Sequence, residues 1–263
     1  MIIDAHTHIY PDSIAQKAAE NISDFYDLNM RYNGTVGSLL AMGGKAGVEK
    51  YVVHSVATLP RQVNAINEFI AGAVNSSGGK FIGFATLHPD DEDIAGHIDN
   101  AMALGLKGVK LHPDFQRFHI DGPRAMKLFE AIEGRLPVLI HAGDYRTDFS
   151  KPGRIVNVMK TFPKLDVIAA HLGGWSEWGD YAGELADRGV YVDTSSSRHW
   201  LPPGTMRELM DIFGEGKVFF GSDYPMWDAS DELDMLMKIL RDDKEKEQIL
   251  HANFERLMEK YSM

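Results

Sequence analysis

The sequence predicts an α/β protein that folds as a single (β/α)8 TIM barrel, with one domain over residues 1–263. Short apolar runs rich in β-branched residues recur along the chain and are continuous rather than alternating, as in parallel strands buried on both faces. Helical patterns lie between these runs, which is the order of elements expected of an α/β fold. The length of 263 residues suits one such barrel.

Eight strands are expected. They are the runs Ile2–Ala5, Lys50–Ser55, Phe81–Ala85, Gly108–Leu111, Val138–Ile140, Val167–Ala170, Val190–Asp193 and Val218–Gly221. A doubly wound open sheet is the other fold that fits such an alternation. The residues after the first strand lack the glycine-rich fingerprint of a dinucleotide-binding fold, which weakens that alternative.

Helices are expected after the second to the eighth strand. They are the segments Arg61–Val74, Ala95–Leu104, Pro123–Ile132, Gly153–Thr161, Trp178–Arg188, Met206–Phe213, Leu233–Arg241 and Lys244–Lys260. The segment 12–47 is longer than a typical βα loop plus one helix. We therefore expect an extra helix near Ser13–Ala19 and a covering loop in that segment.

Composition disfavours several classes of function. The chain has no cysteine, which excludes disulfides, thiolate zinc sites and cysteine nucleophiles. A net charge of −11 disfavours a nucleic-acid partner. No apolar stretch approaches the roughly 18–20 residues that span a bilayer, and the first residues lack the pattern of a signal peptide. We expect a cytoplasmic protein that binds a small molecule, with neither a nucleic-acid nor a membrane partner. A homo-oligomer is an open option.

The first strand ends in two histidines, His6 and His8, two residues apart. Side chains on a strand alternate between its faces, so both imidazoles project from the same face. Asp4 shares that parity one step deeper. Neutral imidazole is a common protein ligand of divalent transition metals. The pair therefore predicts half of a metal site.

Further ligand types fall at the ends of later strands. His112 follows the fourth strand, His141 the fifth, His171 the sixth and Asp223 the eighth. In a (β/α)8 barrel the active site lies at the C-terminal ends of the strands. With the first pair, five of the eleven histidines take matching positions, which scattered core histidines would not be expected to do. The pattern predicts a metal site at these strand ends.

Five motifs at these positions resemble the amidohydrolase superfamily, in particular its amidohydrolase-related (type 2) branch of metal-dependent TIM-barrel hydrolases. In chain order they are Asp4-Ala5-His6-Thr7-His8, Gly108-Val109-Lys110-Leu111-His112-Pro113, Pro137-Val138-Leu139-Ile140-His141, Ala170-His171-Leu172-Gly173-Gly174 and Gly221-Ser222-Asp223-Tyr224-Pro225. The order is that of the family, so the resemblance covers the whole chain. The motifs are specific for the fold and the metal site. They are weakly specific for the substrate, because the branch includes hydrolases, lactonases, decarboxylases and hydratases.

The resemblance implies a role for each matching residue. His6 and His8 bind the metal, and His141 is the third imidazole. Asp223 is both a metal ligand and the general base for the bound water. His171 is either a ligand of a second metal or a hydrogen-bonding catalytic group. Family members commonly hold zinc, and a ligand set of nitrogen and oxygen atoms agrees with one or two Zn²⁺ ions.

Three further residues keep several roles open. Lys110 shares strand parity with His112, so both side chains can face the barrel mouth. Three roles are open for Lys110. It can be carbamylated and bridge two metals, as the corresponding lysine does in binuclear relatives. It can also be an ammonium that binds a substrate carboxylate or phosphate, or a structural lysine inside the barrel. His112 is an additional ligand, a substrate contact or a structural residue. His54, on the second strand, is expected in the core or behind the ligands.

The loops that follow the strands are expected to hold the substrate. Arg117, Arg146 and Arg198 lie in these loops among aromatic residues. Arginine beside aromatic side chains suits a small ligand that is flat or carries a carboxylate. We therefore expect these three arginines to contact the substrate.

Together these residues predict a metal-dependent hydrolase, with zinc favoured, that cleaves a small cyclic amide, ester or lactone. Zinc lowers the pKa of a bound water from about 15.7 toward about 7, and Asp223 is placed to take its proton.

Three alternatives remain. A nonoxidative decarboxylase of an aromatic or unsaturated carboxylic acid belongs to the same branch. Such enzymes often carry Glu in the first motif, where this chain has Asp4 and Ala5. A noncatalytic metal-binding barrel is disfavoured by Asp223, since a protein that does not activate water needs no base there. A TatD-like nuclease is disfavoured by the acidic charge and by the lack of an acidic residue at the end of the third strand.

Overall fold

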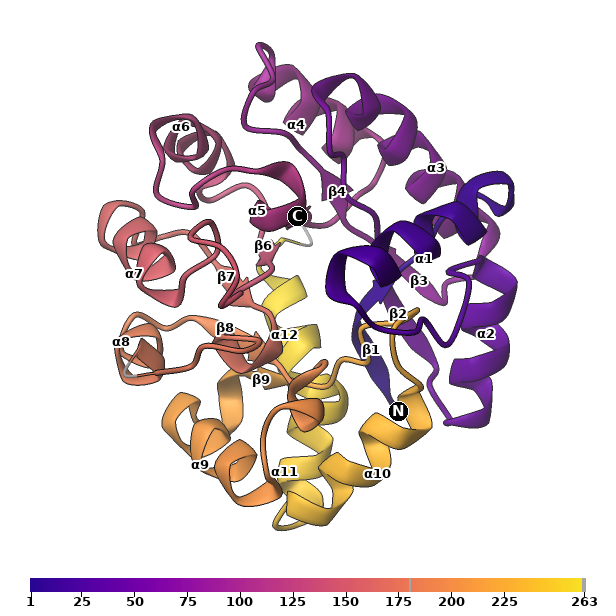
Figure 1. Ribbon diagram of the computed structural model, residues 1–263, viewed down its shortest axis with the longest axis vertical. Helices are drawn as coiled ribbons and strands as arrows, with labels where there is room; N and C mark the ends of the chain where they lie inside the picture. The colour runs from indigo at the N-terminus through magenta and orange to yellow at the C-terminus, as the bar shows by residue number, and fades with distance from the viewer. Residues whose placement is uncertain (180, 262–263) are drawn as a thin grey trace.

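Every strand pair in the part of the chain that the structure describes is parallel. The structure is a computed structural model that describes residues 1–179 and 181–261. One sheet has the order β1 (Ile3–His8), β2 (Lys50–His54), β3 (Phe81–Gly83). The second has the order β4 (Ala85–Thr86), β5 (Val109–Leu111), β6 (Val138–Ile140), β7 (Val167–Ala169), β8 (Tyr191–Asp193), β9 (Val218–Phe219). Figure 1 shows the helices arranged as an outer ring around these strands.

Backbone hydrogen bonds join the two sheets at both seams. Phe84, between β3 and β4, donates its N–H to the carbonyl of Val53 at 3.0 Å. At the other seam, Ala5 of β1 donates its N–H to the carbonyl of Phe220, directly after β9, at 2.9 Å. The strands therefore follow one another around a ring, and the predicted TIM-barrel fold is confirmed.

The third predicted strand, Phe81–Ala85, is divided at Phe84. β3 pairs with β2, and β4 pairs with β5. The ring of Phe84 is fully buried and lies against Gly108, where a Cβ atom would sit 2.5 Å from the ring. The strand thus changes partner where a large side chain enters the barrel and a glycine leaves room for it.

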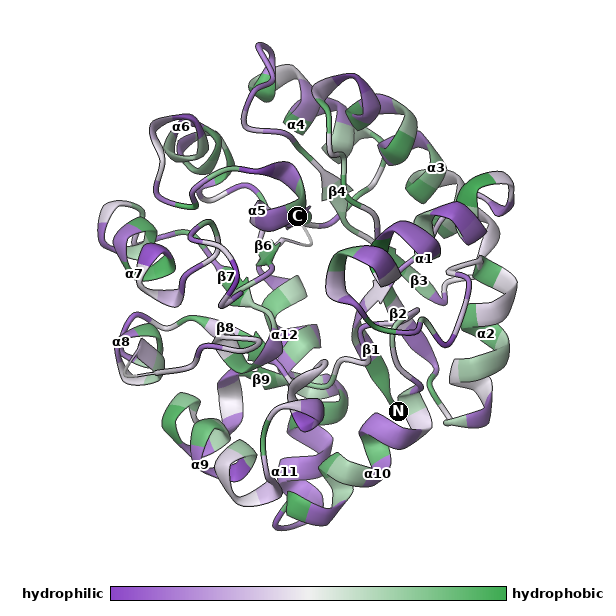
Figure 2. Cartoon of the chain, viewed as in Figure 1, coloured by the Kyte–Doolittle hydropathy of each residue, from purple (hydrophilic) through white to green (hydrophobic). Residues whose placement is uncertain are grey.

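The helices that follow the later strands agree with the predicted segments apart from their ends. They are α3 (Val63–Ser76), α4 (Ile94–Ala103), α6 (Pro123–Ile132), α7 (Pro152–Thr161), α8 (Tyr181–Asp187), α9 (Pro203–Phe213) and α10 (Ala229–Ile239). The predicted helix Trp178–Arg188 includes Asp180, which lies outside the described residues. The outer helices carry both polar and apolar residues (Figure 2), as expected of helices with one buried face. Within residues 1–179 and 181–261, no helix has the length and apolar character needed to cross a membrane.

The last predicted helix, Lys244–Lys260, consists of three pieces. These are α11 (Asp243–Glu247), the π-helix η5 (Gln248–Ala252) and α12 (Asn253–Glu259). Phe254 and Leu257 of α12 pack with Ile3 of β1 and Phe219 of β9 in the smaller of two apolar clusters. Apolar side chains therefore fill the end of the barrel where the strands begin, and the opposite end is left for the site.

Two helices follow β1, where one extra helix and a covering loop were expected. α1 (Asp12–Tyr26) is longer than the predicted helix Ser13–Ala19, and α2 (Val36–Lys45) takes the place of the loop. Thr35 caps α2, since its side-chain oxygen accepts from the N–H of Ser38 at 3.3 Å. In Figure 1, α1 lies across the ends of the first strands.

Within the described residues, four 3₁₀ helices and one short α-helix occupy the connections. They are η1 (Pro60–Gln62), α5 (Pro113–Gln116), η2 (His171–Gly173), η3 (Ser197–His199) and η4 (Glu215–Lys217). Three of these short helices begin within the first four residues after a strand of the barrel. They therefore shape the rim on which the predicted ligands lie.

Asn67 of α3 holds β4 where the sheet changes partner. Its buried amide accepts from the N–H of Thr86 at 2.7 Å and donates to the carbonyl of Thr86 at 3.1 Å. Asn67→Ala leaves both backbone groups unpaired, at roughly 1–3 kcal/mol each. We expect the free energy of unfolding, measured in urea, to fall by about 2–4 kcal/mol. The control Asn64→Ala, on an exposed face of the same helix, should change it by less than about 0.5 kcal/mol. Equal losses in the two variants would contradict this assignment.

Candidate metal centre

The end of β1 brings His6, His8 and Asp223 together. Both imidazoles are buried, and their ring centroids lie 5.4 Å apart. The Oδ1 atom of Asp223 lies 3.4 Å from Nε2 of His6 and 3.6 Å from Nε2 of His8. Three of the predicted ligands thus meet at the rim of the barrel, as the strand-end pattern implied.

Asp223 is held by its backbone and by one of its oxygens. Its N–H donates to the carbonyl of His6 at 2.9 Å, and its φ of +61° lies in the left-handed region, which Asp tolerates better than most residues. Ser196 donates its hydroxyl to Oδ2 at 2.6 Å. Gly221 lets the segment that carries Asp223 lie close to His6 and Ser195, because a Cβ atom there would sit 3.0 Å from Cβ of His6 and 3.2 Å from Cβ of Ser195. The fixed carboxylate therefore presents Oδ1 to the histidine pair.

Asp193, to which the sequence assigned no role, fixes the orientation of His6. Its Oδ2 accepts from Nδ1 of His6 at 2.9 Å. Its Oδ1 accepts from the backbone N–H of His171 at 3.1 Å and of Ser195 at 3.0 Å. Because the carboxylate accepts the proton on Nδ1, the Nε2 lone pair of His6 is left for a ligand. The place of Asp193 at the end of a predicted strand was the only sequence feature that marked it.

His171 follows β7 and lies between His6 and His141. Its ring is stacked at 5.2 Å from that of His6, and its Nε2 lies 3.0 Å from Nδ1 of His141. Its Nδ1 lies 2.9 Å from the hydroxyl and 3.0 Å from the carbonyl of Ser195. One potential ligand atom from each of His6, His171 and Asp193 lies within 4.8 Å of the other two.

His141, predicted as the third imidazole, belongs to a different group of potential ligands. That group is Asp114, His141 and Asp144, again with ligand atoms within 4.8 Å of one another. The Nε2 atom of His141 lies 3.7 Å from Oδ2 of Asp114, and neither atom has a hydrogen-bond partner among the described residues. The geometry therefore links His141 to the first group through His171.

His112 contacts the covering helix. Its ring stacks on that of His141, with centroids 4.1 Å apart and an interplanar angle of 9°. Its Nε2 lies 2.9 Å from the hydroxyl of Tyr26 at the end of α1. Tyr26 was not predicted as a site residue, because its segment was expected to be a loop and carried no ligand type.

Lys110 lies inside the barrel and is fully buried. Its Nζ is 2.8 Å from Nε2 of His6, the atom whose lone pair a cation would use. Burial lowers the pKa of Lys110 to about 8, against the opposing charges of Asp223 and Asp193. The amine therefore competes with a cation for His6, and its position agrees with each of the three roles considered for it.

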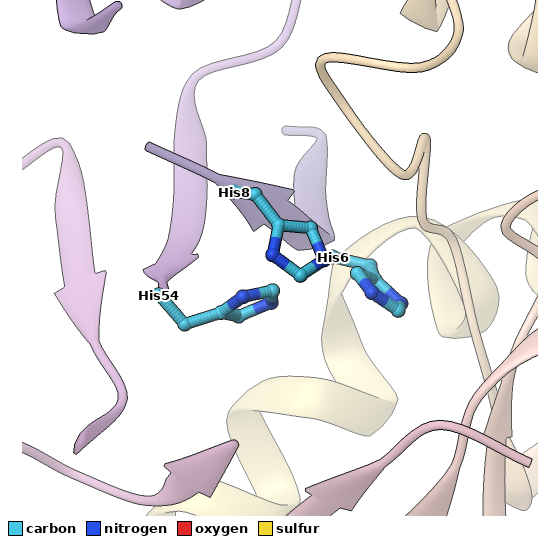
Figure 3. A group of neighbouring side chains, drawn as sticks. All are labelled: His6, His8 and His54. Atoms are coloured by element: carbon cyan, nitrogen blue, oxygen red, sulfur yellow. The ribbon is translucent and has the colours of Figure 1, made fainter. Parts of the chain in front are cut away.

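His54 lies beside the histidine pair of β1. His8 and His54 are opposite one another in the β1–β2 register, and their ring centroids are 4.4 Å apart. Figure 3 shows the imidazoles of His6, His8 and His54 gathered at the ends of the two strands. One potential ligand atom from each lies within 4.8 Å of the other two. The expectation of a core or supporting histidine did not include this grouping.

Two cavities meet at this rim on either side of α1. The smaller, of about 20 Å³, is lined by candidate ligands and by Ile22 and Tyr26 of α1, and it has room for about one water-sized group. The larger, of about 250 Å³, shares His8 and Phe115 with the first and is also lined by Arg117. The covering helix thus forms a wall of both cavities.

The three predicted substrate arginines differ in their contacts. The side chain of Arg117 has no hydrogen bond or ion pair within residues 1–179 and 181–261 and is exposed. Arg146 pairs with Asp144 at 2.6 Å. Arg198 pairs with Glu232 at 2.6 Å. Arg117 is therefore the unpaired cation of the three, and the substrate roles of all three stay predictions.

The donor set fits a divalent cation. Burial lowers the pKa of each imidazole of the centre, to about 3 for His8, which keeps these side chains in the neutral form that binds metals. Buried nitrogen atoms without partners on His54 and His141 remain available, and Asp223 adds a carboxylate. Neutral imidazole with carboxylate suits zinc and other divalent transition ions.

Comparison with known proteins identifies the family of this chain. The model of the family described as Amidohydrolase matches residues 3–259, whereas no curated protein matches the chain.

Several solved structures share the fold. An uncharacterised TIM-barrel protein from Bordetella bronchiseptica is 18% identical, with a TM-score of 0.81 over 100% of this chain and 99% of that one. A dihydroxybenzoic acid decarboxylase from a Polaromonas species, solved with bound manganese and 2-nitroresorcinol, is 14% identical, with a TM-score of 0.77 over 98% and 96%. A candidate 2-pyrone-4,6-dicarboxylic acid hydrolase from Pseudomonas putida is 19% identical, with a TM-score of 0.70 over 100% and 98%. At these identities the likeness shows the fold.

The buried histidines predict a loss of stability in mild acid. Burial lowers the pKa of seven histidines, which are His6, His8, His54, His88, His112, His141 and His171. The unfolded chain therefore binds more protons than the folded chain below pH 6.5, and stability falls as pH falls. Two carboxyl groups act in the opposite direction. Burial raises the pKa of Asp4 to about 7 and also raises the pKa of Asp114. The seven histidines outnumber these two groups, so the net effect is a loss of stability.

We therefore expect metal-free protein to lose several kcal/mol of unfolding free energy between pH 7.5 and 5.5, at about 1.4 kcal/mol per net proton and pH unit. Urea midpoints at pH 7.5, 6.5 and 5.5 measure the trend. A midpoint that stays constant across this range would show that the histidines are not held neutral by the fold.

Proposed function

The chain belongs to the amidohydrolase family, and from this premise we propose that it is a metal-dependent enzyme that hydrolyses a small cyclic amide, ester or lactone bearing a carboxylate. We take the whole chain as the one functional domain. The observation that carries the proposal is the position of Asp223, whose Oδ1 faces Nε2 of both His6 and His8 while Ser196 holds Oδ2. A carboxylate beside potential metal ligands is the group that general-base activation of water needs.

We assign the cation to His6, His8 and Asp223, with His141 and His171 beside them. Zinc is the favoured ion, and the manganese bound in the Polaromonas decarboxylase makes that ion the first alternative. When bound, such a cation supplies a water that ionises near neutral pH and a positive charge beside the scissile carbonyl.

The chain's own residues then handle the proton and the orientation of the centre. Asp223 accepts the proton of the attacking water at Oδ1 and returns it to the leaving group. Asp193 keeps His6 in the tautomer that presents Nε2 to the cation. We assign His171, 3.0 Å from His141, the role of a hydrogen-bonding group beside the reacting water.

The substrate class follows from the two cavities at the rim. The smaller cavity holds the reacting groups but has room for little more than a water. The larger one extends from His8 to Arg117, and a guanidinium without an internal partner is suited to bind a carboxylate. We therefore place the ring of the substrate between these cavities, with its carboxylate at Arg117.

Decarboxylation of an aromatic carboxylic acid is the second candidate. The Polaromonas structure, named as a dihydroxybenzoic acid decarboxylase, supports it, as the Pseudomonas protein named as a candidate pyrone hydrolase supports hydrolysis. One assay separates the two reactions. Metal-loaded protein is offered lactones and cyclic amides that carry a carboxylate, and in parallel dihydroxybenzoates. Ring opening without release of carbon dioxide supports hydrolysis, whereas carbon dioxide from the benzoates supports the alternative.

Asp223→Asn tests the proposed general base in the same assay. We expect the catalytic rate to fall by about 10²–10⁴-fold, the usual contribution of general acid–base catalysis. Metal content is measured on the same sample, so that loss of the ion is distinguished from loss of the base. Asp234→Asn, at an exposed position of α10, is the matched control and should keep the wild-type rate. Full activity of the Asp223 variant would exclude this residue as the base, whereas a metal-loaded wild type without activity in either assay would favour a noncatalytic barrel.

Arg117→Met tests the carboxylate contact. We expect KM for the carboxylated substrate to rise at least about 10-fold with little change in kcat, because a charged hydrogen-bond partner worth roughly 1.5–3 kcal/mol is removed away from the reacting bond. The loss should disappear when the substrate carboxylate is replaced by a methyl ester. Arg188→Met, exposed just beyond α8, is the control for the loss of one positive charge. An unchanged KM in the Arg117 variant would place the substrate elsewhere.

A further inference from the structure

We infer that His54 is a ligand of the bound cation, so that His6, His8 and His54 form a three-imidazole site across β1 and β2. The inference rests on the proposed function only in requiring that a divalent cation binds at this rim. It adds a ligand from the second strand to the residues already assigned.

The first observation is that His54 is buried without a hydrogen-bond partner. Its exposed fraction is 0%, and neither ring nitrogen has a partner among the described residues. Buried polar side chains in folded proteins almost always have at least one partner, from the protein, a water or an ion. An imidazole with both nitrogens unpaired therefore points to a ligand of the site.

The second observation is the direction in which His54 lies. Its ring stands at 89° to that of His8, with centroids 4.4 Å apart, and at 66° to that of His6, at 5.2 Å. In Figure 3 the three rings converge on a common region at the ends of β1 and β2. The potential ligand atoms lie within 4.8 Å of one another. Two nitrogen ligands of one zinc ion lie at most about 4.2 Å apart, so side-chain shifts of less than about 1 Å bring the three imidazoles to one ion.

The backbone fixes this arrangement. The parallel register places His54 beside His8, and the carbonyl of His54 accepts from the N–H of Ile9 at 3.0 Å. Because these bonds lock the two strands together, the backbone positions that carry the imidazoles of His8 and His54 are held side by side before any ion arrives. A site whose backbone is fixed in this way needs little reorganisation to bind a cation.

A cation explains the group better than a water. A water molecule donates two hydrogens at most, whereas the three imidazoles, kept neutral by burial, each offer a lone pair to one small region. Asp223, whose Oδ1 lies within 3.6 Å of both His6 and His8, adds a negative charge at the same place. Three neutral nitrogens and one carboxylate form a donor set for zinc or a related ion.

The test measures Zn²⁺ binding by the full chain after removal of metal with a chelator. We expect His54→Asn to raise the dissociation constant, measured by chelator competition, by more than the roughly 10–100-fold that loss of a merely supporting residue causes. X-ray absorption on the loaded protein should count one imidazole fewer than in wild type. His88→Asn is the matched control, because His88 is also buried with an unpartnered Nε2 but lies in the loop after β4. It should leave both readouts unchanged.

Two further measurements keep the result interpretable. Circular dichroism and thermal unfolding of the metal-free variants show whether His54→Asn folds, and His54→Gln is the second variant if it does not. Unchanged affinity and an unchanged imidazole count in a folded His54 variant would overturn this role and leave the proposed centre intact. A wild-type chain that binds no Zn²⁺ or Mn²⁺ would overturn both proposals.

Discussion

The candidate centre depends on the buried carboxylate of Asp193. A carboxylate without water is stable in a protein only when its oxygens accept hydrogen bonds, and Asp193 accepts from Nδ1 of His6 and from the backbone of His171 and Ser195. These donors come from β1, from η2 and from the loop after β8. One carboxylate therefore fixes the distance between two candidate ligands and selects the tautomer of His6. The rim of the barrel is organised around this interaction.

The barrel supplies the conditions for that interaction. Below the rim, apolar side chains from several strands and from α12 fill the interior, so water is excluded from the base of the site. Asp4, one step below His6 on the same face of β1, marks the change from apolar to polar. Its Oδ1 accepts from the N–H of Ser222 at 2.9 Å and ties β1 to the segment that carries Asp223. Since Gly221 in this segment has no side chain, the two strand ends approach closely enough for Asp223 to reach both histidines.

The sequence predicted the position of a site residue well where a single strand determines it. It predicted less where the position depends on how several strands pack together. The two-residue spacing of His6 and His8 is a property of one strand, and the placement of Asp223 follows from the rule that barrel sites lie at strand ends. The grouping of His54 with His8 depends on the register between β1 and β2, which no local pattern encodes. The approach of His141 to Asp114 depends on how its ring turns, although His141 also lines the same cavity as His6, His8 and Asp223. The covering helices were only partly predicted, because segment 12–47 forms two helices where one extra helix and a loop were expected.

The same buried groups that suit a cation make the metal-free chain less stable than it could be. Each unpaired buried polar atom costs roughly 1–3 kcal/mol, and several lie together on His54, His141 and Asp114. Folding alone favours no such arrangement, whereas a cation that binds only the folded state offsets the cost, by about 4 kcal/mol when its concentration is 1,000 times its dissociation constant. The apolar base of the barrel and the fully bonded Asp193 supply the stability that permits these groups to remain unpaired. The group of unpaired polar atoms on His54, His141 and Asp114 at the rim, above a well-packed interior, is therefore better explained by binding than by packing.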